Sequence, residues 1–124
     1  MAQPSFPVSS LAVGLGGGLG AWLRVIAGRL IPSPAFPYAT LAVNVLGCFA
    51  MGLLTAWLAR AGGSEGLRLL LGVGVLGGFT TFSAFSLEIV TLAQRGAIAM
   101  VAVYVAASLV GGIAALLLGL RIFA

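Results

Sequence analysis

The chain contains no histidine, and its only acidic residues are Glu65 and Glu88. It offers no pair of carboxylates at helical spacing and no nucleophile beside a candidate base, so the sequence predicts that the protein is not an enzyme. Cys48 is the single cysteine, which excludes a disulfide or a cysteine metal site within one chain. The six basic residues are scattered arginines without interleaved aromatic residues, so no nucleic-acid partner is expected.

Apolar residues make up most of the chain. Of its 124 residues, 61% are hydrophobic and only 6% are charged, whereas a soluble domain carries roughly 25% charged residues. The sequence therefore predicts an integral membrane protein. Residues 1–10 lack the basic region of a secretory signal, so we expect the first apolar stretch to be retained as a membrane span.

Four apolar stretches, at residues 8–26, 38–58, 67–93 and 98–123, are each long enough to cross a bilayer. A helix needs about 20 residues for this, because it rises 1.5 Å per residue across a hydrocarbon core of ~30 Å. The connections at 28–37, 59–66 and 94–96 are too short to be domains. We predict an all-α membrane protein whose residues 1–124 form a single unit of four transmembrane helices.

The third stretch is interrupted by the sequence GGFTTFSAFS at residues 77–86. In hydrocarbon, a backbone that leaves the helical path must bury its polar groups in protein or turn them toward a water-filled cavity. Broken helices at mid-membrane depth usually line a site for an ion or a substrate. The sequence thus predicts a third helix that is broken within the membrane and lines such a site.

The arginines divide evenly between the two sides of a four-span protein. One side carries Arg60, Arg68 and Arg121, and the other carries Arg24, Arg29 and Arg95. The positive-inside rule therefore gives no preferred orientation. Two interpretations follow: a weak signal in a protein with one topology, or dual topology with antiparallel pairing of two chains.

Glycines on the first span have the GxxxG spacing that allows close approach of helices. Gly14 and Gly18 form one such pair, and Gly16 and Gly20 form another. They either pack helices within one chain or join two chains. Because four helices leave little room for an enclosed pathway, we expect an oligomer.

Several polar residues lie at membrane depth, where each is costly. On the second span Thr40, Asn44 and Cys48 share one helix face. Asn44 has two interpretations that the sequence weighs evenly: an interhelical hydrogen bond, or an N–H donor to an anion. Arg24 either extends to the interface or concentrates anions at a pore mouth.

The third and fourth spans carry further candidates. Phe82 and Phe85 share a face beyond the break, as packing residues or as the wall of a site. Glu88 lies one turn further on and must be paired, hydrated or protonated. Tyr104 and Ser108 share a face on the fourth span.

Three segments of the chain match motifs of one known family. Residues 18–24, GLGAWLR, resemble the family motif GxGAxxR. Residues 40–47, TLAVNVLG, resemble GTLxVNxxG, with Ala39 in place of the usual leading glycine. Residues 77–86 resemble GGxTTFSTF, with Ala84 in place of a threonine or serine. Through these motifs the chain resembles the CrcB/Fluc family of fluoride channels, and the resemblance covers essentially its whole length.

The resemblance implies a double-barrelled, dual-topology antiparallel homodimer in the inner or plasma membrane that exports fluoride passively and so relieves its toxicity. It also implies that the backbone carbonyls of Gly77 and Thr80 from both chains hold one structural Na⁺. An all-carbonyl site suits such a hard cation. The expected partners are a second copy of the chain, the fluoride ion and the lipid bilayer.

The same resemblance assigns a fluoride pathway. Asn44 donates to the ion, and the ring edges of Phe82 and Phe85 form an aromatic box around it. The remaining pathway residues by resemblance are Arg24, Thr40, Ser83, Glu88, Tyr104 and Ser108.

Two other classes of membrane protein compete with the fluoride-channel assignment. A small multidrug-resistance transporter would need a glutamate in its first span, which is missing here, and an assembly subunit would leave the break unexplained.

Overall fold

The computed structural model describes residues 3–124, so the first two residues of the predicted unit lie outside it. The elements in chain order are α1 (Phe6–Leu30), α2 (Tyr38–Ala61), α3 (Glu65–Leu67), the π-helix η1 (Arg68–Leu76), α4 (Gly77–Phe79), α5 (Ser83–Gln94) and α6 (Ile98–Ile122). Elements α3 to α5 form one span, Glu65–Gln94, and all four spans are long and apolar enough to cross a membrane. No strand occurs in the described part of the chain, so the predicted all-α class is confirmed.

Local sequence explains where the helices begin and end. Pro7 lies in the first turn of α1, where its missing N–H costs nothing. Gly62 ends α2 with φ +67°, and Gly96 makes the turn before α6 with φ +77°, both in the left-handed region that favours glycine. Arg29 and Arg60 lie in the last turns of α1 and α2, beside the negative end of each helix dipole.

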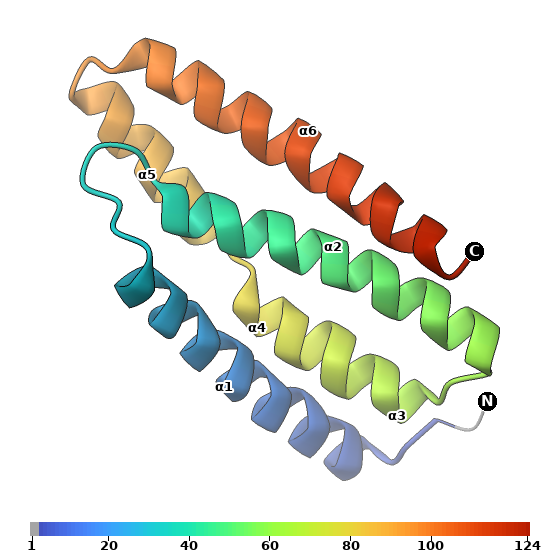
Figure 1. Cartoon of the computed structure of the whole chain (residues 1–124). Coiled ribbons are helices and arrows are strands. Elements are labelled where there is room, and N and C mark those ends of the chain that lie inside the picture. The colour runs from blue at the N-terminus through green and yellow to red at the C-terminus, as the bar shows by residue number, and fades with distance from the viewer. Residues whose placement is uncertain (1–2) are drawn as a thin grey trace.

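The spans pack in two pairs, α1 against η1 and α4, and α2 against α6 (Figure 1). Glycines allow the first contact: a Cβ on Gly20 would collide with Val75 O and lie 2.7 Å from Phe79 N. Gly16 likewise faces the backbone of η1, so this glycine pair packs helices within one chain. A Cβ on Gly14 or Gly18 would meet nothing within 4 Å, so these two glycines face outward.

The third span widens and then breaks. In η1 the hydrogen bonds reach back further than in an α-helix, and the N–H of Gly77 donates to the carbonyls of Gly72 and Gly74. At Thr80 the backbone turns to an extended conformation, with φ −83° and ψ 160°. Helix α5 begins only at Ser83. The predicted break is therefore present, directly after the two glycines.

Figure 1 shows the start of α1, the α2–α3 connection and the C-terminus at one end of the bundle. The α1–α2 loop and the α5–α6 turn lie at the opposite end. This is the arrangement that four spans with short connections require. Arg60, Arg68 and Arg121 therefore lie toward one end and Arg29 and Arg95 toward the other, whereas Arg24 lies more than one turn before the end of α1.

Candidate functional site

Asn44 on α2 holds the broken segment of the third span. Its Oδ1 accepts a hydrogen bond from the Thr81 N–H at 2.8 Å, and its Nδ2 donates to Thr81 O at 3.0 Å. One amide thus satisfies both backbone groups of a residue that has left the helix. The interhelical hydrogen bond considered from the sequence is present. Because an amide nitrogen carries two hydrogens, one donor of Asn44 remains for another partner.

The bonds made by Thr81 redirect two backbone donors at the break. In a continuous helix the Thr81 N–H would bond to Gly77 O, but it bonds to Asn44 instead. The Ala84 N–H would bond to Thr80 O, but it bonds to Thr81 Oγ1 at 3.1 Å. The carbonyl oxygens of Gly77 and Thr80 therefore both lose their usual helical donors.

These two carbonyls are oxygen ligands of the kind that a hard cation prefers. Within residues 3–124 no group of three histidine, cysteine or acidic side chains lies close enough to hold a metal. The Thr80 hydroxyl donates to Leu76 O at 3.0 Å.

Arg24 brings a positive charge from α1 to the break. Its Nε donates to Gly78 O at 3.2 Å. Gly78 packs so tightly on α1 that an added Cβ would collide with Gly17 O. The half-buried arginine is therefore directed at the end of α4 rather than only toward the membrane interface.

A cavity of about 270 Å³ lies beside the break, between α2, α5 and α6. Its lining residues are Asn44, Cys48, Thr80, Thr81, Phe82, Phe85, Ser108 and Leu109. The rings of Phe82 and Phe85 form one wall, with centroids 5.8 Å apart. Phe85 is buried, whereas Phe82 is 77% exposed in the single chain.

Ser108 is the polar group that the cavity leaves unsatisfied. Its Oγ is buried and has no hydrogen-bond partner among the described residues. A buried hydroxyl without a partner costs about 1–3 kcal/mol. This cost favours a ligand or a water molecule at the same place. The cavity thus combines apolar walls with a small number of free polar atoms.

A row of aromatic rings leads away from this cavity. The Phe85 ring meets Tyr104 edge-on at 5.0 Å, and Tyr104 meets Phe36 edge-on at 5.5 Å. Tyr104 is completely buried, and its hydroxyl donates to Glu88 Oε1 at 3.5 Å. Tyr104 therefore connects the cavity at the break with Glu88.

The structure does not gather every predicted pathway residue at one cavity. Thr40 lines a separate space of about 60 Å³ that it shares with Arg24. Ser83 is exposed at the start of α5, with its Oγ 3.4 Å from Thr81 Oγ1. Glu88 lines another cavity, at the end of the bundle that holds the α1–α2 loop.

Sequence reasoning missed Thr81 and Phe36. Thr81 stands inside the interrupted segment, so its position at the break was the signal that its backbone groups needed a partner. Phe36 belongs to a proline-containing loop that the sequence marks only as a connection. Nothing in that pattern indicated a contact between this ring and a buried tyrosine.

Comparison with known proteins gives one consistent result. The family model described as CrcB-like protein, Camphor Resistance (CrcB), matches residues 11–120. A protein of Novosphingobium aromaticivorans named fluoride-specific ion channel FluC is 58% identical over 115 residues, which cover 89% of this chain and 91% of the relative. A relative from Paracoccus denitrificans with the same name is 51% identical over 116 residues, which cover 90% of this chain and 91% of the relative.

A third relative of this name, from Mesorhizobium japonicum, is 50% identical over 114 residues, which cover 89% of this chain and 91% of the relative. These names describe ion channels, a class without catalytic chemistry, so the expectation that the protein is not an enzyme is confirmed. The family model matches most of the chain, and the relatives align along nearly its whole length. The chain belongs to the CrcB-like family of membrane proteins, the family that its three motifs indicated.

Proposed function

We propose that the chain forms a fluoride-selective channel that lets F⁻ leave the cell passively. The observation that carries the proposal is the cavity at the broken third span, where polar atoms without partners face aromatic rings. The relatives named as fluoride-specific channels support the choice of ion. The structure supplies the reason why such a cavity suits a small anion.

Fluoride would be held in this cavity by two kinds of donor. The free N–H of Asn44 and the hydroxyl of Ser108 replace part of its hydration shell. The ring edges of Phe82 and Phe85 carry the positive end of the aromatic quadrupole, so their C–H groups attract an anion. Chloride carries the same charge, so pore width and donor placement have to supply the selectivity.

The direction of transport follows from electrostatics. HF crosses membranes uncharged and dissociates near neutral pH, which traps F⁻ inside the cell. At a membrane potential near −100 mV, moving one negative charge outward gains about 2.3 kcal/mol. A selective pore therefore exports fluoride without ATP or proton coupling.

The functional unit in this proposal is an antiparallel homodimer in the cell's inner or plasma membrane. Three features support a second copy: the balance of arginines, the outward-facing glycines of α1 and the 77% exposed ring of Phe82. Phe82 stands on the wall of the cavity, so the site is incomplete until something covers this ring. Each dimer would then contain two pores.

One Na⁺ would join the two breaks at the centre of the dimer. The carbonyls of Gly77 and Thr80 have lost their helical donors, and an unpaired carbonyl in hydrocarbon costs several kcal/mol. Two chains would supply four such oxygens, a donor set that fits a hard cation. The ion would hold the breaks together and take no part in moving fluoride.

Reconstitution into liposomes tests the proposed function. Purified protein should release F⁻ down its gradient, release Cl⁻ far more slowly and drive no proton flux when a cationic drug is supplied. Proton flux coupled to the drug would instead indicate a multidrug transporter. An absence of all three fluxes would favour an assembly subunit.

The sodium site has a test of its own. Replacing Na⁺ with a large organic cation during purification should weaken the dimer, which would be followed on a sizing column. An unchanged dimer would contradict the sodium site.

A further inference from the structure

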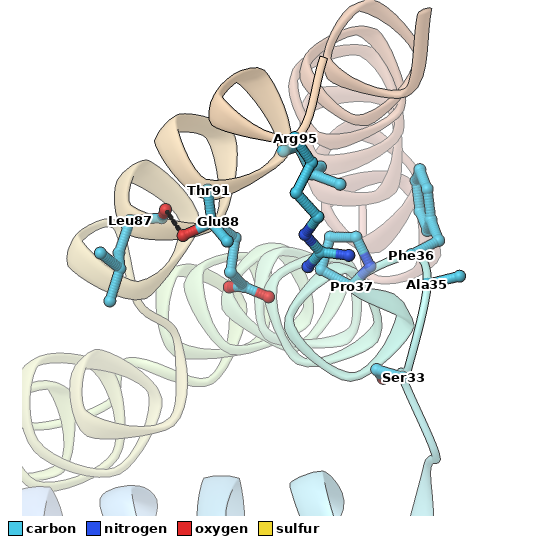
Figure 2. Close-up of a pocket in the computed structure, with 9 residues that line it drawn as sticks. Ser33, Ala35, Phe36, Pro37, Leu87, Glu88, Thr91 and Arg95 are labelled. Atoms are coloured by element: carbon cyan, nitrogen blue, oxygen red, sulfur yellow. Dashed lines mark hydrogen bonds between the residues drawn. The ribbon is translucent and has the colours of Figure 1, made fainter. Parts of the chain in front are cut away.

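A second cavity, of about 200 Å³, lies at the end of the bundle that holds the α1–α2 loop (Figure 2). The loop forms one wall with Phe36 and Pro37, and the second half of α5 forms the other with Glu88 and Thr91. Arg95, directly beyond the end of α5, lines the same space. The cavity therefore lies where the third span reaches the membrane surface.

The loop is folded over this space by its own hydrogen bonds. Ser33 Oγ accepts from the Ala39 N–H at 3.0 Å and donates to Ile31 O at 3.1 Å. These bonds tie the loop to the first turn of α2, whose N-cap is the buried Pro37. The positive end of the α2 dipole thus adjoins the cavity.

Two opposite charges border the cavity without pairing. Figure 2 shows the side chains of Arg95 and Glu88 directed into the same space from α5 and its end. No ion pair joins them, and within residues 3–124 the Arg95 guanidinium makes no hydrogen bond. Its five N–H donors therefore remain available to a ligand. Glu88 already accepts from the Tyr104 hydroxyl at 3.5 Å.

One buried side chain separates this cavity from the one at the break. Tyr104 contacts Phe36 and Glu88 on the outer side and Phe85 on the inner side. Phe36 and Glu88 line the outer cavity, and Phe85 lines the inner one. Tyr104 therefore contacts residues that line each of the two cavities.

We infer that the outer cavity is the mouth of the ion pathway and that Arg95 binds small inorganic anions there. The inference rests on the proposed function, in which fluoride occupies the inner cavity. Glu88 alone would repel an anion from the mouth. The guanidinium of Arg95 faces the same space and offsets this repulsion, while its N–H groups replace water around the arriving or departing ion.

Fluoride efflux from liposomes at low salt tests the role of Arg95. We expect Arg95→Gln to slow efflux by roughly three- to tenfold and Arg95→Glu by more than tenfold, since a charge at a pore mouth changes the local ion concentration by such factors. Arg95→Lys keeps the charge but loses the forked set of N–H donors, so its efflux should lie between that of the unmodified protein and that of Arg95→Gln. Raising the salt to 1 M should shrink these differences, because the screening length falls to about 3 Å.

Arg29 provides the matched control. Arg29 lies in the last turn of α1, at the same end of the bundle as Arg95. It is exposed and does not line the cavity. Arg29→Glu should therefore leave efflux within about twofold of the unmodified protein. If Arg29→Glu and Arg95→Glu slow efflux equally, the effect belongs to the whole surface and the inference is overturned. It is also overturned if Arg95→Glu conducts like the unmodified protein.

Thiol labelling at position 95 tests the same inference if Arg95→Glu does not fold. Arg95→Cys, purified and then labelled in detergent, can receive a positive or a negative thiol reagent on the same folded protein. The positive label should restore efflux and the negative label should reduce it further, and equal rates would contradict the inference. The unmodified protein treated with both reagents controls for reaction at Cys48. If the unmodified protein releases no fluoride at all, the proposed function fails rather than the assignment of Arg95.

Discussion

Replacing Asn44 with aspartate tests the two roles that the structure gives this side chain. Asn44→Asp keeps an oxygen that accepts from the Thr81 N–H, so one bond of the pair at 2.8 Å is preserved. It removes the Nδ2 donor to Thr81 O, at 3.0 Å, and the second N–H that would face the anion. We expect a protein that still forms dimers but passes no measurable fluoride.

The expected magnitude follows from charge and distance. A carboxylate about 4 Å from a fluoride ion opposes it by ~4 kcal/mol at an effective dielectric constant of 20. Since 1.36 kcal/mol corresponds to a tenfold change in rate, efflux should fall by about 10³-fold. The lost interhelical hydrogen bond adds a smaller cost of about 1–2 kcal/mol to the stability of the broken segment.

Purified variants would be reconstituted into liposomes, with efflux followed by a fluoride electrode and dimers by elution from a sizing column. Asn44→Leu is the matched control, because it carries no charge but leaves both backbone groups of Thr81 without partners. This variant should lose dimers and folded protein, whereas the aspartate variant should retain them. Efflux within about twofold of the unmodified protein in Asn44→Asp would refute a role for Asn44 in anion passage.

Three further sets of variants test the aromatic wall of the cavity at the break, the packing of α1 and the orientation of the chain in the membrane. Phe82→Ile and Phe85→Ile should each slow fluoride efflux by at least about tenfold, or ~1.4 kcal/mol, because an aliphatic group lacks a positive ring edge. The elution of the dimer should not change. Near-normal efflux in both variants would refute the aromatic contribution. Gly20→Ala places a methyl group against Val75 O and should lower the yield of folded protein, whereas Gly18→Ala should not lower it; equal yields would contradict the packing of α1 described above. A reporter on the C-terminus should give signal from both sides of the membrane, and two lysines added at the N-terminus should bias it toward a cytoplasmic end. A signal from one side only, in the protein without added lysines, would contradict antiparallel pairing.

The sequence was most informative where the bilayer restricts the possible structures. Four apolar stretches and the shortage of charge led directly to four spanning helices. The interruption at residues 77–86 predicted the break, because hydrocarbon tolerates irregular backbone only where partners exist. Asn44 at depth indicated an interhelical bond, although not which backbone groups it would satisfy.

Other features depended on contacts that no local pattern encodes. The π-helix before the break lies against the backbone of α1, and periodicity in a glycine-rich apolar segment does not distinguish it from an α-helix. The pairs Gly14/Gly18 and Gly16/Gly20 have the same GxxxG spacing. Only the second pair faces a neighbouring helix within the chain. Arg24 reached the break instead of only the interface because η1 and α4 pack directly on α1.

The reversal potential of the reconstituted protein tests the central claim most directly. With a tenfold fluoride gradient across the membrane and equal chloride on both sides, a passive fluoride-selective pore should reverse near the fluoride equilibrium potential, about 59 mV in magnitude. The value should not change when a pH gradient is added. A potential well short of this value would show that chloride also permeates, and a potential that follows the pH gradient would show proton coupling. Either result would contradict a passive fluoride-selective channel.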